Sequence, residues 1–239
     1  MEFTDIHIHA LFGVDDGAKN ENEMNAIVEA AYADGVRTLC LTPHFHPGYF
    51  GENTDRSSAA FALLLQYAEQ HCPQLNLFLG NELRYSQDCI SWLKEGQCRT
   101  LNQTRYVLVD FSETEAEKGI VTGLEKLLNA GYIPILAHAE RYRGLSAEIK
   151  KLEGLRENGV LIQVDVQALF GRFGLRIQRR AKSILANGLA TFVASDAHDL
   201  IGRPPGISAG YNFIAKKYGT DYANAVCNEN ALHLLQGSQ

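Results

Sequence analysis

The sequence lacks the features that mark several large classes of protein. No basic stripe or run of Lys and Arg suggests a nucleic-acid partner, and the formal net charge is −6. No apolar run approaches the length of a membrane span, so membrane insertion is not expected. The first residues pass straight into a charged strand, and no secretory signal is visible. No stretch rich in Pro, Gly or Ser divides the 239 residues, which predicts a single domain over residues 1–239.

Cysteine is scarce and follows no recognisable spacing. The chain has five cysteines, an odd number, and no C-x-x-C pair. This usage is typical of reduced thiols in packing positions and indicates a cytoplasmic protein. The signatures of several enzyme classes are also missing. There is no Ser-His-Asp order, no glycine loop that would cradle a phosphate and no dinucleotide fingerprint.

A repeated unit organises the chain. A helix ends in glycine, a short apolar strand follows, and the strand ends in polar residues; the copies are residues 35–44, 131–138, 159–165 and 188–198. With strands at 3–8, 75–79 and 106–109, about seven buried parallel strands are expected. A doubly wound sheet would gather its ligands at one switch point, whereas here polar clusters follow nearly every strand. A closed or nearly closed α/β barrel of the TIM-like kind is therefore favoured.

The apolar pattern of the helices predicts which faces they bury. The helix over 22–34 has an apolar stripe of Met24, Ile27, Val28 and Ala31. The helix over 55–71 is expected to turn Leu63, Leu64 and Tyr67 inward. The tail predicts helices over 207–218 and 221–226, then a short one capped by Asn228 or Asn230, all packed outside the barrel.

The polar residues at the strand ends form a set of metal ligands. In Asp5-Ile6-His7-Ile8-His9, the alternation of a strand sends Asp5, His7 and His9 to one side. Mixed imidazole and carboxylate ligands suit manganese, iron or zinc, and the absence of cysteine argues against structural zinc. Eight ligands are too many for one ion, so two or three are expected, with Glu82 and Asp196 as bridges. The candidate ligands are His7, His9, His44, Glu82, Asp110, His138, Asp196 and His198.

Two arginines follow candidate ligands closely and complete a site for phosphoryl hydrolysis. Divalent ions activate water, and arginine neutralises the charge that spreads over a transferring phosphoryl group. Arg141 follows His138, and Arg203 precedes the rigid pair Pro204-Pro205; a surface salt bridge is the alternative role for each.

Several further polar residues have open roles. Asp15 and Asp16 either form an acidic turn, or one of them binds a metal ion or contacts a residue that does. His46 belongs to a solvated loop or the mouth of the site. Asp165 and Gln167 are expected at the rim of the site or in contact with the metal ligands. His71 and His233 are expected at ordinary helix positions.

The set of motifs resembles the PHP (polymerase and histidinol phosphatase) superfamily. It is most similar to the bacterial manganese-dependent protein-tyrosine phosphatases of capsule and exopolysaccharide clusters. The matching stretches are Asp5 to His9, Val14 to Gly17, Gly35 to Thr38, Thr42 to His44, Ala137 to Tyr142, Ser195 to His198, Arg203 to Pro205 and Ala215 to Gly219.

This resemblance implies a distorted (β/α)7 barrel with three metal ions, Mn²⁺ above all, and Arg141 and Arg203 holding the phosphate. It also implies a phosphotyrosine protein as substrate, expected to be the tyrosine-rich tail of a polysaccharide-assembly kinase. Two departures stand out: Asp110 where glutamate is usual, and Phe45-His46-Pro47 in place of a more basic segment. The alternatives are a histidinol-phosphate or other small-molecule phosphatase, or a metal-binding regulatory module without turnover.

Overall fold

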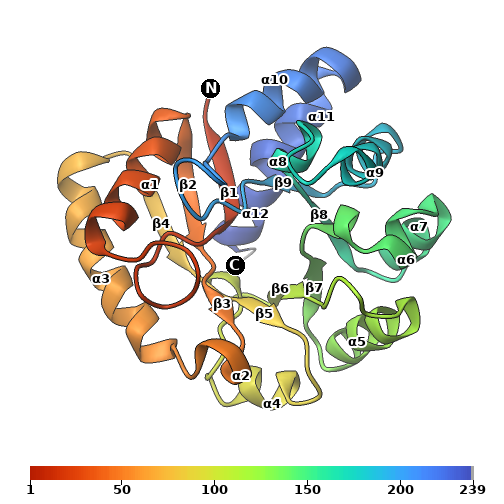
Figure 1. Ribbon diagram of the computed structural model, residues 1–239, viewed down its shortest axis with the longest axis horizontal. Coiled ribbons are helices and arrows are strands. Elements are labelled where there is room, and N and C mark those ends of the chain that lie inside the picture. The colour runs from red at the N-terminus through yellow and green to blue at the C-terminus, as the bar shows by residue number, and fades with distance from the viewer. Residues whose placement is uncertain (238–239) are drawn as a thin grey trace.

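Parallel strands alternate with helices along the chain in the computed structural model, which describes residues 1–237 (Figure 1). The strands are β1 (Phe3–Ile8), β2 (Val36–Leu41), β3 (His44–Phe45), β4 (Asn76–Leu79), β5 (Glu82–Arg84), β6 (Tyr106–Asp110), β7 (Ile133–Leu136), β8 (Leu161–Asp165) and β9 (Phe192–Ala194). They pair in two parallel runs, β1–β2–β4 and β3–β5–β6–β7–β8–β9.

The two runs of strands close into one barrel. β3 follows β2 after only two residues, and β5 follows β4 in the same way, so each pair shares one position. β9 returns to β1 through two main-chain bonds: Asp196 N donates to His7 O (2.8 Å) and His9 N donates to Ala197 O (2.8 Å). Within residues 1–237, nine strands thus fill seven positions, and the predicted distorted seven-position α/β barrel is confirmed.

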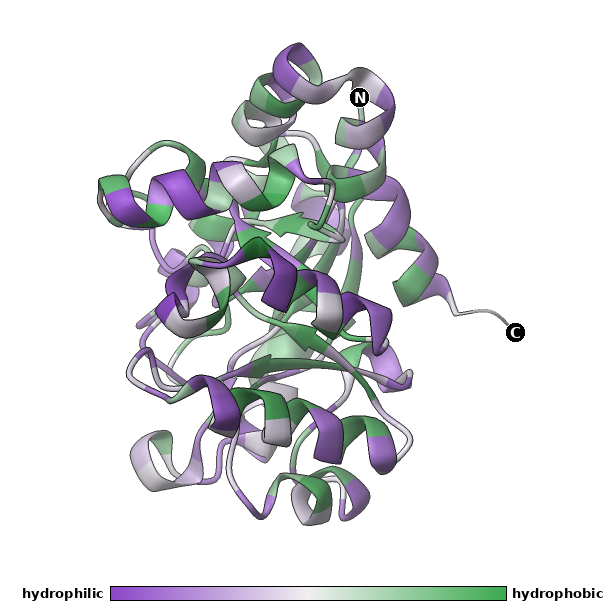
Figure 2. Ribbon diagram, turned by 90° about the vertical axis from the view of Figure 1, so that its right-hand side faces the viewer, coloured by the Kyte–Doolittle hydropathy of each residue, from purple (hydrophilic) through white to green (hydrophobic). Residues whose placement is uncertain are grey.

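The helices form a ring around the strands (Figure 1), and Figure 2 shows their apolar sides turned toward the barrel. No helix within residues 1–237 has both the length and the apolar character needed to cross a membrane. The helices are α1 (Glu21–Ala33), α2 (Pro47–Phe50), α3 (Thr54–His71), α4 (Cys89–Lys94), α5 (Glu117–Asn129), α6 (Arg143–Ser146), α7 (Ile149–Glu157), α8 (Val166–Leu169), α9 (Leu175–Ala186), α10 (Ile207–Tyr218), α11 (Thr220–Asn224) and α12 (Asn230–Gln236), with short turns η1 (Leu101–Gln103), η2 (Ala139–Arg141) and η3 (Ala225–Glu229).

α1 begins and packs as its sequence predicts. The Asn20 side chain accepts a hydrogen bond from Glu23 N (3.0 Å), and Glu23 Oε2 accepts one from Lys19 N (2.9 Å). This reciprocal cap satisfies backbone donors that the first turn leaves unpaired. The predicted apolar stripe is buried; it consists of Met24, Ile27, Val28 and Ala31.

The predicted inner face of α3 was partly wrong. Leu64 is fully buried, but Leu63 is 41% exposed and Tyr67 lies at the edge, where its hydroxyl donates to Glu29. The helix instead buries small residues, Ser57, Ala60 and Ala68, together with Leu64. Three consecutive leucines at 63–65 cannot share one face of a helix, because successive residues point about 100° apart.

α12 closes the barrel floor, so the predicted position outside the barrel was wrong for this last helix, whereas α10 and α11 lie in the outer ring as predicted. Alternate strand residues separate into two apolar clusters: Val107 and Val109 pack under the helices, whereas Leu108 joins an inner cluster that includes Leu234 and Leu235 of α12. Figure 2 shows α12 at the right-hand edge, on the side turned away from the viewer of Figure 1.

Neither predicted cap in the tail forms. α11 continues without a break through the π turn η3 into α12, which begins at Asn230, and neither Asn228 nor Asn230 caps a helix with its side chain. Both side chains bind the floor of the barrel instead: Thr4 Oγ1 donates to Asn228 Oδ1 (2.8 Å), and Asn230 Nδ2 donates to Thr191 O (2.9 Å).

Candidate metal centre and active site

The eight candidate ligands all lie at the mouth of the barrel formed by the carboxyl ends of the strands. They are His7 and His9 at the end of β1, His44 in β3, Glu82 in β5, Asp110 at the end of β6, His138 after β7, and Asp196 and His198 after β9. In the register of β3 and β5, His44 is the direct neighbour of Glu82. The short strands β3 and β5, which the sequence analysis did not separate from β2 and β4, therefore bring these two residues together.

The buried carboxylate of Glu82 is the centre of the cluster. Its Oε2 lies 3.3 Å from both His7 Nε2 and His9 Nε2, and 2.8 Å from His44 Nδ1. Its Oε1 lies 2.9 Å from His138 Nε2. Burial alone raises the pKa of Glu82, but the charges of His44 and His7 outweigh this effect and hold it well below its usual value.

Asp196 contacts the same two imidazoles as Glu82. Asp196 Oδ1 lies 3.3 Å from His7 Nε2 and 3.4 Å from His9 Nε2, and the two ring nitrogens are 3.1 Å apart. Ligand atoms bound at about 2.1 Å to one tetrahedral or octahedral ion are separated by roughly 3.0–3.4 Å. The spacing of His7, His9 and Glu82 therefore fits a single divalent ion between them.

Two of the eight residues have an unusual backbone. His138 has φ 32° and Asp196 has φ 49°, in the left-handed region that residues with a Cβ rarely adopt. Both follow the last residues of barrel strands, and both side chains turn into the cluster, where His138 meets Glu82 and Asp196 meets His7. Such conformations persist where the surroundings enforce them, and they concentrate at functional sites.

The structure assigns different roles to Asp15 and Asp16. Asp15 Oδ2 lies 2.7 Å from His9 Nδ1 and accepts a hydrogen bond from His44 N (2.9 Å), so Asp15 orients two candidate ligands from behind. Asp16 Oδ1 lies 3.5 Å from the Nε2 atoms of both His44 and His198, on the open side of the cluster. Both aspartates thus belong to the site.

Gly17 lets the Asp15–Asp16 turn approach β1. A Cβ on Gly17 would lie 1.9 Å from the carbonyl oxygen of His9, a separation that no side chain tolerates. The neighbouring Ala18 N donates to the same carbonyl oxygen (3.3 Å). Glycine at this position is therefore a condition for Asp15 to reach His9.

Asp110 reaches the cluster but is held by other side chains. Its Oδ1 accepts a hydrogen bond from the Tyr142 hydroxyl (2.8 Å) and lies 3.8 Å from His138 Nε2, while its Oδ2 pairs with Arg84 Nη2 (3.1 Å). Burial and the charge of Glu82 raise the pKa of Asp110 to about 7.

The sequence analysis missed Arg84 and Gln163. Arg84 stands two residues after Glu82 in β5, so strand alternation places both on one face, and this signal was available. Gln163 Oε1 accepts a hydrogen bond from His138 N (2.7 Å) and lies 3.2 Å from His7 Nδ1. Gln163 comes from β8, and only the closed barrel reveals these contacts.

Asp5 stands apart from the imidazoles despite its place in the first motif. Its Oδ1 accepts hydrogen bonds from His7 N and Ser195 N, both at 3.2 Å, which ties β1 to the end of β9. Burial raises the pKa of Asp5 to about 6.

Burial also lowers the pKa of His138 to about 3, aided by the charge of Arg141.

The two predicted arginines converge on Asp196. Arg141 Nη2 donates to Asp196 Oδ2 (2.6 Å) and to Asp165 Oδ2 (2.7 Å), and its guanidinium lies 4.4 Å from the centre of the Phe173 ring. Arg203 Nη2 also pairs with Asp196 Oδ2, and its Nη1 donates to His198 Nε2 (3.0 Å). Both arginines thus face the buried ligand cluster, where each forms an ion pair with Asp196.

The structure also places the other polar residues that the sequence analysis considered. Asp165 fixes Arg141, and Gln167 Nε2 donates to Pro204 O (2.7 Å), which holds the loop that carries Arg203. His46 precedes α2 and stacks on Tyr49, with ring centres 5.9 Å apart. His71 lies in α3 and His233 in α12, both away from the mouth of the barrel.

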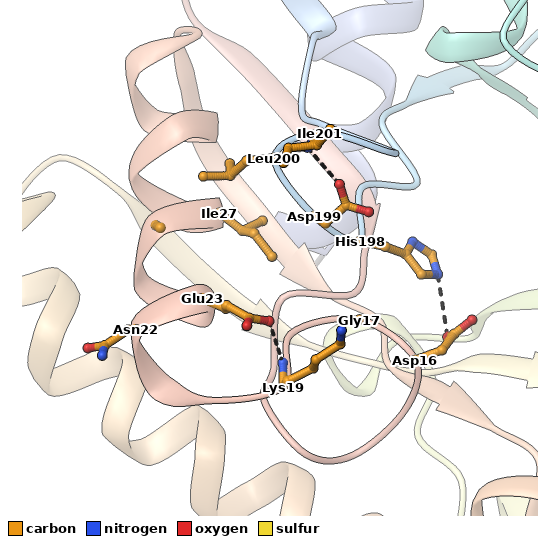
Figure 3. A pocket seen from close by; sticks show the side chains of 11 residues that line it. Asp16, Gly17, Lys19, Asn22, Glu23, Ile27, His198, Asp199, Leu200 and Ile201 are labelled. Atoms are coloured by element: carbon orange, nitrogen blue, oxygen red, sulfur yellow. Dashed lines mark hydrogen bonds and ion pairs between the residues drawn. The ribbon is translucent and has the colours of Figure 1, made fainter.

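Two hollows meet at the cluster. A small pocket of about 140 Å³ is bounded by His44, Glu82, Arg84, Asp110, His138, Arg141, Asp196 and Arg203, with Phe111 and Glu113 at its edge. A groove of about 550 Å³ starts at Asp16 and His198 and runs between α1 and the loop of Leu200 and Ile201 (Figure 3). Ile201 is 88% exposed at its rim.

The residues present fit bound divalent ions. Glu82 Oε2 is buried without a hydrogen-bond partner within residues 1–237, although three imidazole nitrogens lie within 3.3 Å of it. An ion between these atoms would satisfy all of them. Three groups of side chains have ligand atoms close enough to share an ion; they are His7, His9 and Glu82; His44, Glu82 and Asp110; and His9, Asp16, His44 and His198.

Fold and site together define a parallel α/β barrel with a histidine–carboxylate cluster at the carboxyl end of its strands. A family model described as "Capsular polysaccharide synthesis, CpsB/CapC" matches residues 3–236. The chain belongs to this CpsB/CapC family.

Named relatives agree with this assignment along nearly the whole chain. The chain is 35% identical over 237 residues to the tyrosine-protein phosphatase CpsB of Streptococcus agalactiae, covering 97% of this chain and 98% of that protein. It is 30% identical over 233 residues to the tyrosine-protein phosphatase YwqE of Bacillus subtilis, covering 97% and 91%.

Solved structures show the same fold. One described as YwqE from Bacillus subtilis and CpsB from Streptococcus pneumoniae, "unique metal-dependent tyrosine phosphatases", superposes with a TM-score of 0.90 at 28% identity, covering 100% of this chain and 96% of that one. The phosphotriesterase homology protein of Escherichia coli shares the fold at a TM-score of 0.60 and 10% identity, covering 95% and 96%.

Replacement of Asp15 tests its role behind His9 and His44. In Asp15→Asn, an amide group replaces one of the carboxylate oxygens that face His9 Nδ1, His44 N and Gly17 N, so the His9 ring and the His44 backbone lose a fixed partner. Removing such a partner weakens metal binding about 10–100-fold, and we expect this loss in titrations with Mn²⁺. Asp88→Asn removes the same charge at an exposed position before α4 and serves as the control. Equal Mn²⁺ affinity of Asp15→Asn and wild type would contradict the assignment.

Proposed function

We propose that the chain is a metal-dependent phosphomonoesterase that hydrolyses phosphotyrosine in proteins, and that residues 1–239 form a single catalytic domain. The observation that carries the proposal is the arrangement around Glu82: four imidazoles contact one buried carboxylate, and two arginines stand beside it. The names of the relatives support the same activity, because those proteins are called tyrosine-protein phosphatases.

The eight ligands with Asp16 are proposed to hold two or three ions around Glu82. Asp196 would complete the group of His7, His9 and Glu82, and His138 lies beside the group that contains Asp110. Nitrogen and carboxylate ligands in this ratio suit Mn²⁺, which we propose as the ion, with iron or zinc as the alternatives. Divalent ions bound there supply an activated water near neutral pH and offset the negative charge of a phosphate.

Arg141 and Arg203 are proposed to hold the phosphoryl group in the 140 Å³ pocket that both line. Within residues 1–237, the Nε atom of each arginine is buried without a hydrogen-bond partner. A phosphate oxygen in the pocket would accept hydrogen bonds from these unsatisfied N–H groups. Such charge-assisted hydrogen bonds are stronger than hydrogen bonds between neutral groups. Asp165 and the ring of Phe173 keep Arg141 in place before the substrate arrives.

The open groove beside the pocket favours a protein substrate over a small phosphate ester. A phosphotyrosine side chain that enters the pocket leaves its backbone at the mouth, where the groove of Figure 3 offers room next to Asp16 and His198. Tyrosinate is also a good leaving group, since the pKa of tyrosine is about 10. We propose a tyrosine-rich tail of a kinase of capsular polysaccharide assembly as the substrate, and the cytoplasm as the compartment, in keeping with five buried free thiols.

Initial rates on three substrate classes test the proposed function. The purified protein, supplemented with each metal in turn, is expected to hydrolyse a phosphotyrosine peptide faster than histidinol phosphate or a phosphodiester, and fastest with Mn²⁺. EDTA should abolish the activity and Mn²⁺ should restore it. Faster turnover of histidinol phosphate would favour the small-molecule alternative, undiminished activity in EDTA would exclude a metal-dependent enzyme, and binding of metal without turnover of any ester would favour a regulatory module.

Alanine at either arginine separates phosphate binding from metal binding. Arg141→Ala and Arg203→Ala should keep their ions in elemental analysis, yet lose about 100-fold or more in kcat/KM, because a contact to the developing charge is worth about 3 kcal/mol. Lysine should restore only part of the rate, since a point charge cannot replace the planar fork of a guanidinium.

His44→Ala serves as the contrasting variant, since it removes a contact to Glu82 and should lose metal and rate together. An Arg203→Ala enzyme with the wild-type kcat/KM on a phosphotyrosine peptide would show that Arg203 only positions Asp196 and His198.

A further inference from the structure

The most uneven distribution of charge in the chain lies between β8 and β9. No Asp or Glu occurs between Asp165 and Asp196, although the chain has 28 acidic residues against 22 basic ones. Five basic residues fall in this stretch; they are Arg172, Arg176, Arg179, Arg180 and Lys182. The net charge of −6 concealed this segment from the sequence analysis, which found no basic stripe.

The fold gathers these arginines, with Arg143 of α6, on one surface. Arg143, Arg172, Arg176 and Arg179 are exposed and Arg180 is half-buried. Positions 176, 179 and 180 recur at the spacing of one face of α9, and Arg172 lies in the turn just before this helix. α9 packs against the turn η2, and α6 with Arg143 begins two residues after η2, so Arg143 and the arginines of α9 come from neighbouring elements. In keeping with this arrangement, burial and the charges of Arg143 and Arg176 lower the pKa of Arg180. We call this set of five arginines the α9 surface.

The α9 surface is costly for the stability of the isolated protein. The ion pairs of Arg and Lys within residues 1–237 involve Arg84, Arg141, Arg203 and Lys151, and none of the five arginines of the surface. Like charges three or four residues apart on a helix repel each other, and cations near a helix N-terminus oppose its dipole. The first turn of α9 contains no acidic residue that would offset either effect.

The α9 surface is continuous with the active site. Arg172 Nη2 donates to Ile201 O (2.9 Å), in the loop that carries Arg203. Arg180 Nη1 donates to Glu140 O (3.4 Å), in the turn η2 that carries Arg141. Phe173, between these arginines in the sequence, stacks on Arg141 itself. A chain that leaves the pocket on this side therefore passes directly onto the five arginines.

We propose that the α9 surface binds an acidic segment of the phosphotyrosine protein, next to the phosphotyrosine that occupies the pocket. This proposal rests on the proposed phosphatase function. Charge complementarity identifies the occupant as a chain rich in Asp, Glu or further phosphotyrosines. A lipid surface fits less well, because α9 buries Ala181, Ile184 and Leu185 in the protein. Leu175 is the single large apolar side chain that α9 exposes, which is too small an apolar face for insertion into a membrane.

A matched pair of double variants tests the proposal. Arg176→Gln/Arg179→Gln removes two charges from the α9 surface without altering any side chain that contacts the candidate ligands. Arg105→Gln/Lys126→Gln removes the same charge from two exposed residues at the opposite end of the barrel, before β6 and in the last turn of α5. Each protein is assayed with Mn²⁺ on a phosphotyrosine peptide flanked by Asp and Glu, on the same peptide with Asn and Gln, and on para-nitrophenyl phosphate.

At about 0.01 M salt, the wild type is expected to favour the acidic peptide by about 10-fold in kcat/KM, mainly through KM. Most of this preference should disappear in Arg176→Gln/Arg179→Gln and persist in the control, while turnover of para-nitrophenyl phosphate stays unchanged in both. The preference should also fade as salt rises toward about 1 M, because the Debye length falls from about 30 Å to about 3 Å.

Three results would overturn the α9 proposal alone, and a fourth would overturn it together with the proposed function. Equal kcat/KM of the wild type on the two peptides would show that no acidic segment is recognised. Equal losses on all three substrates would show that the arginines act on the phosphate alone. Binding of the wild type to vesicles containing phosphatidylglycerol, without a preference for the acidic peptide, would assign the surface to a membrane. Turnover of para-nitrophenyl phosphate with no turnover of either peptide would refute the proposed function itself, and the α9 proposal with it.

Discussion

The site depends on one buried carboxylate surrounded by imidazole rings. Glu82 contacts His7, His9, His44 and His138 from three other positions of the barrel, and each contact needs a closed barrel to exist. Several unpaired nitrogens and a carboxylate taken out of water would cost far more than their mutual contacts return. The cluster is thus poorly explained by stability, and the surrounding fold is what keeps it assembled.

The rest of the barrel offsets this cost, because other residues hold the candidate ligands in position from the side away from the cluster. Asp15 fixes the ring of His9, Gln163 fixes His138, and Asp5 ties the end of β9 to β1. α12 fills the opposite end of the barrel with Leu234 and Leu235, so the mouth alone is left polar. The same fold occurs in the phosphotriesterase homology protein at 10% identity, which shows that very different sequences form this barrel.

The barrel and the convergence of the eight candidate ligands at its mouth could be predicted because their signals are local. Apolar strands that end in polar residues repeat along the chain, and parallel strands bring those ends to one side. What was missed depends on tertiary packing: the exposure of Leu63, the position of α12 and the contacts of Gln163. Arg84 had a local signal, its spacing from Glu82, but only the pairing with Asp110 gives it a role.

Anomalous scattering from crystals grown with Mn²⁺ tests the central claim most directly. We expect one manganese peak between His7, His9, Glu82 and Asp196, and at least one more within about 4 Å of it that shares the Glu82 carboxylate. Peaks elsewhere on the molecule, or none at a concentration of Mn²⁺ that supports phosphatase activity, would contradict the claim that Glu82 organises a metal centre.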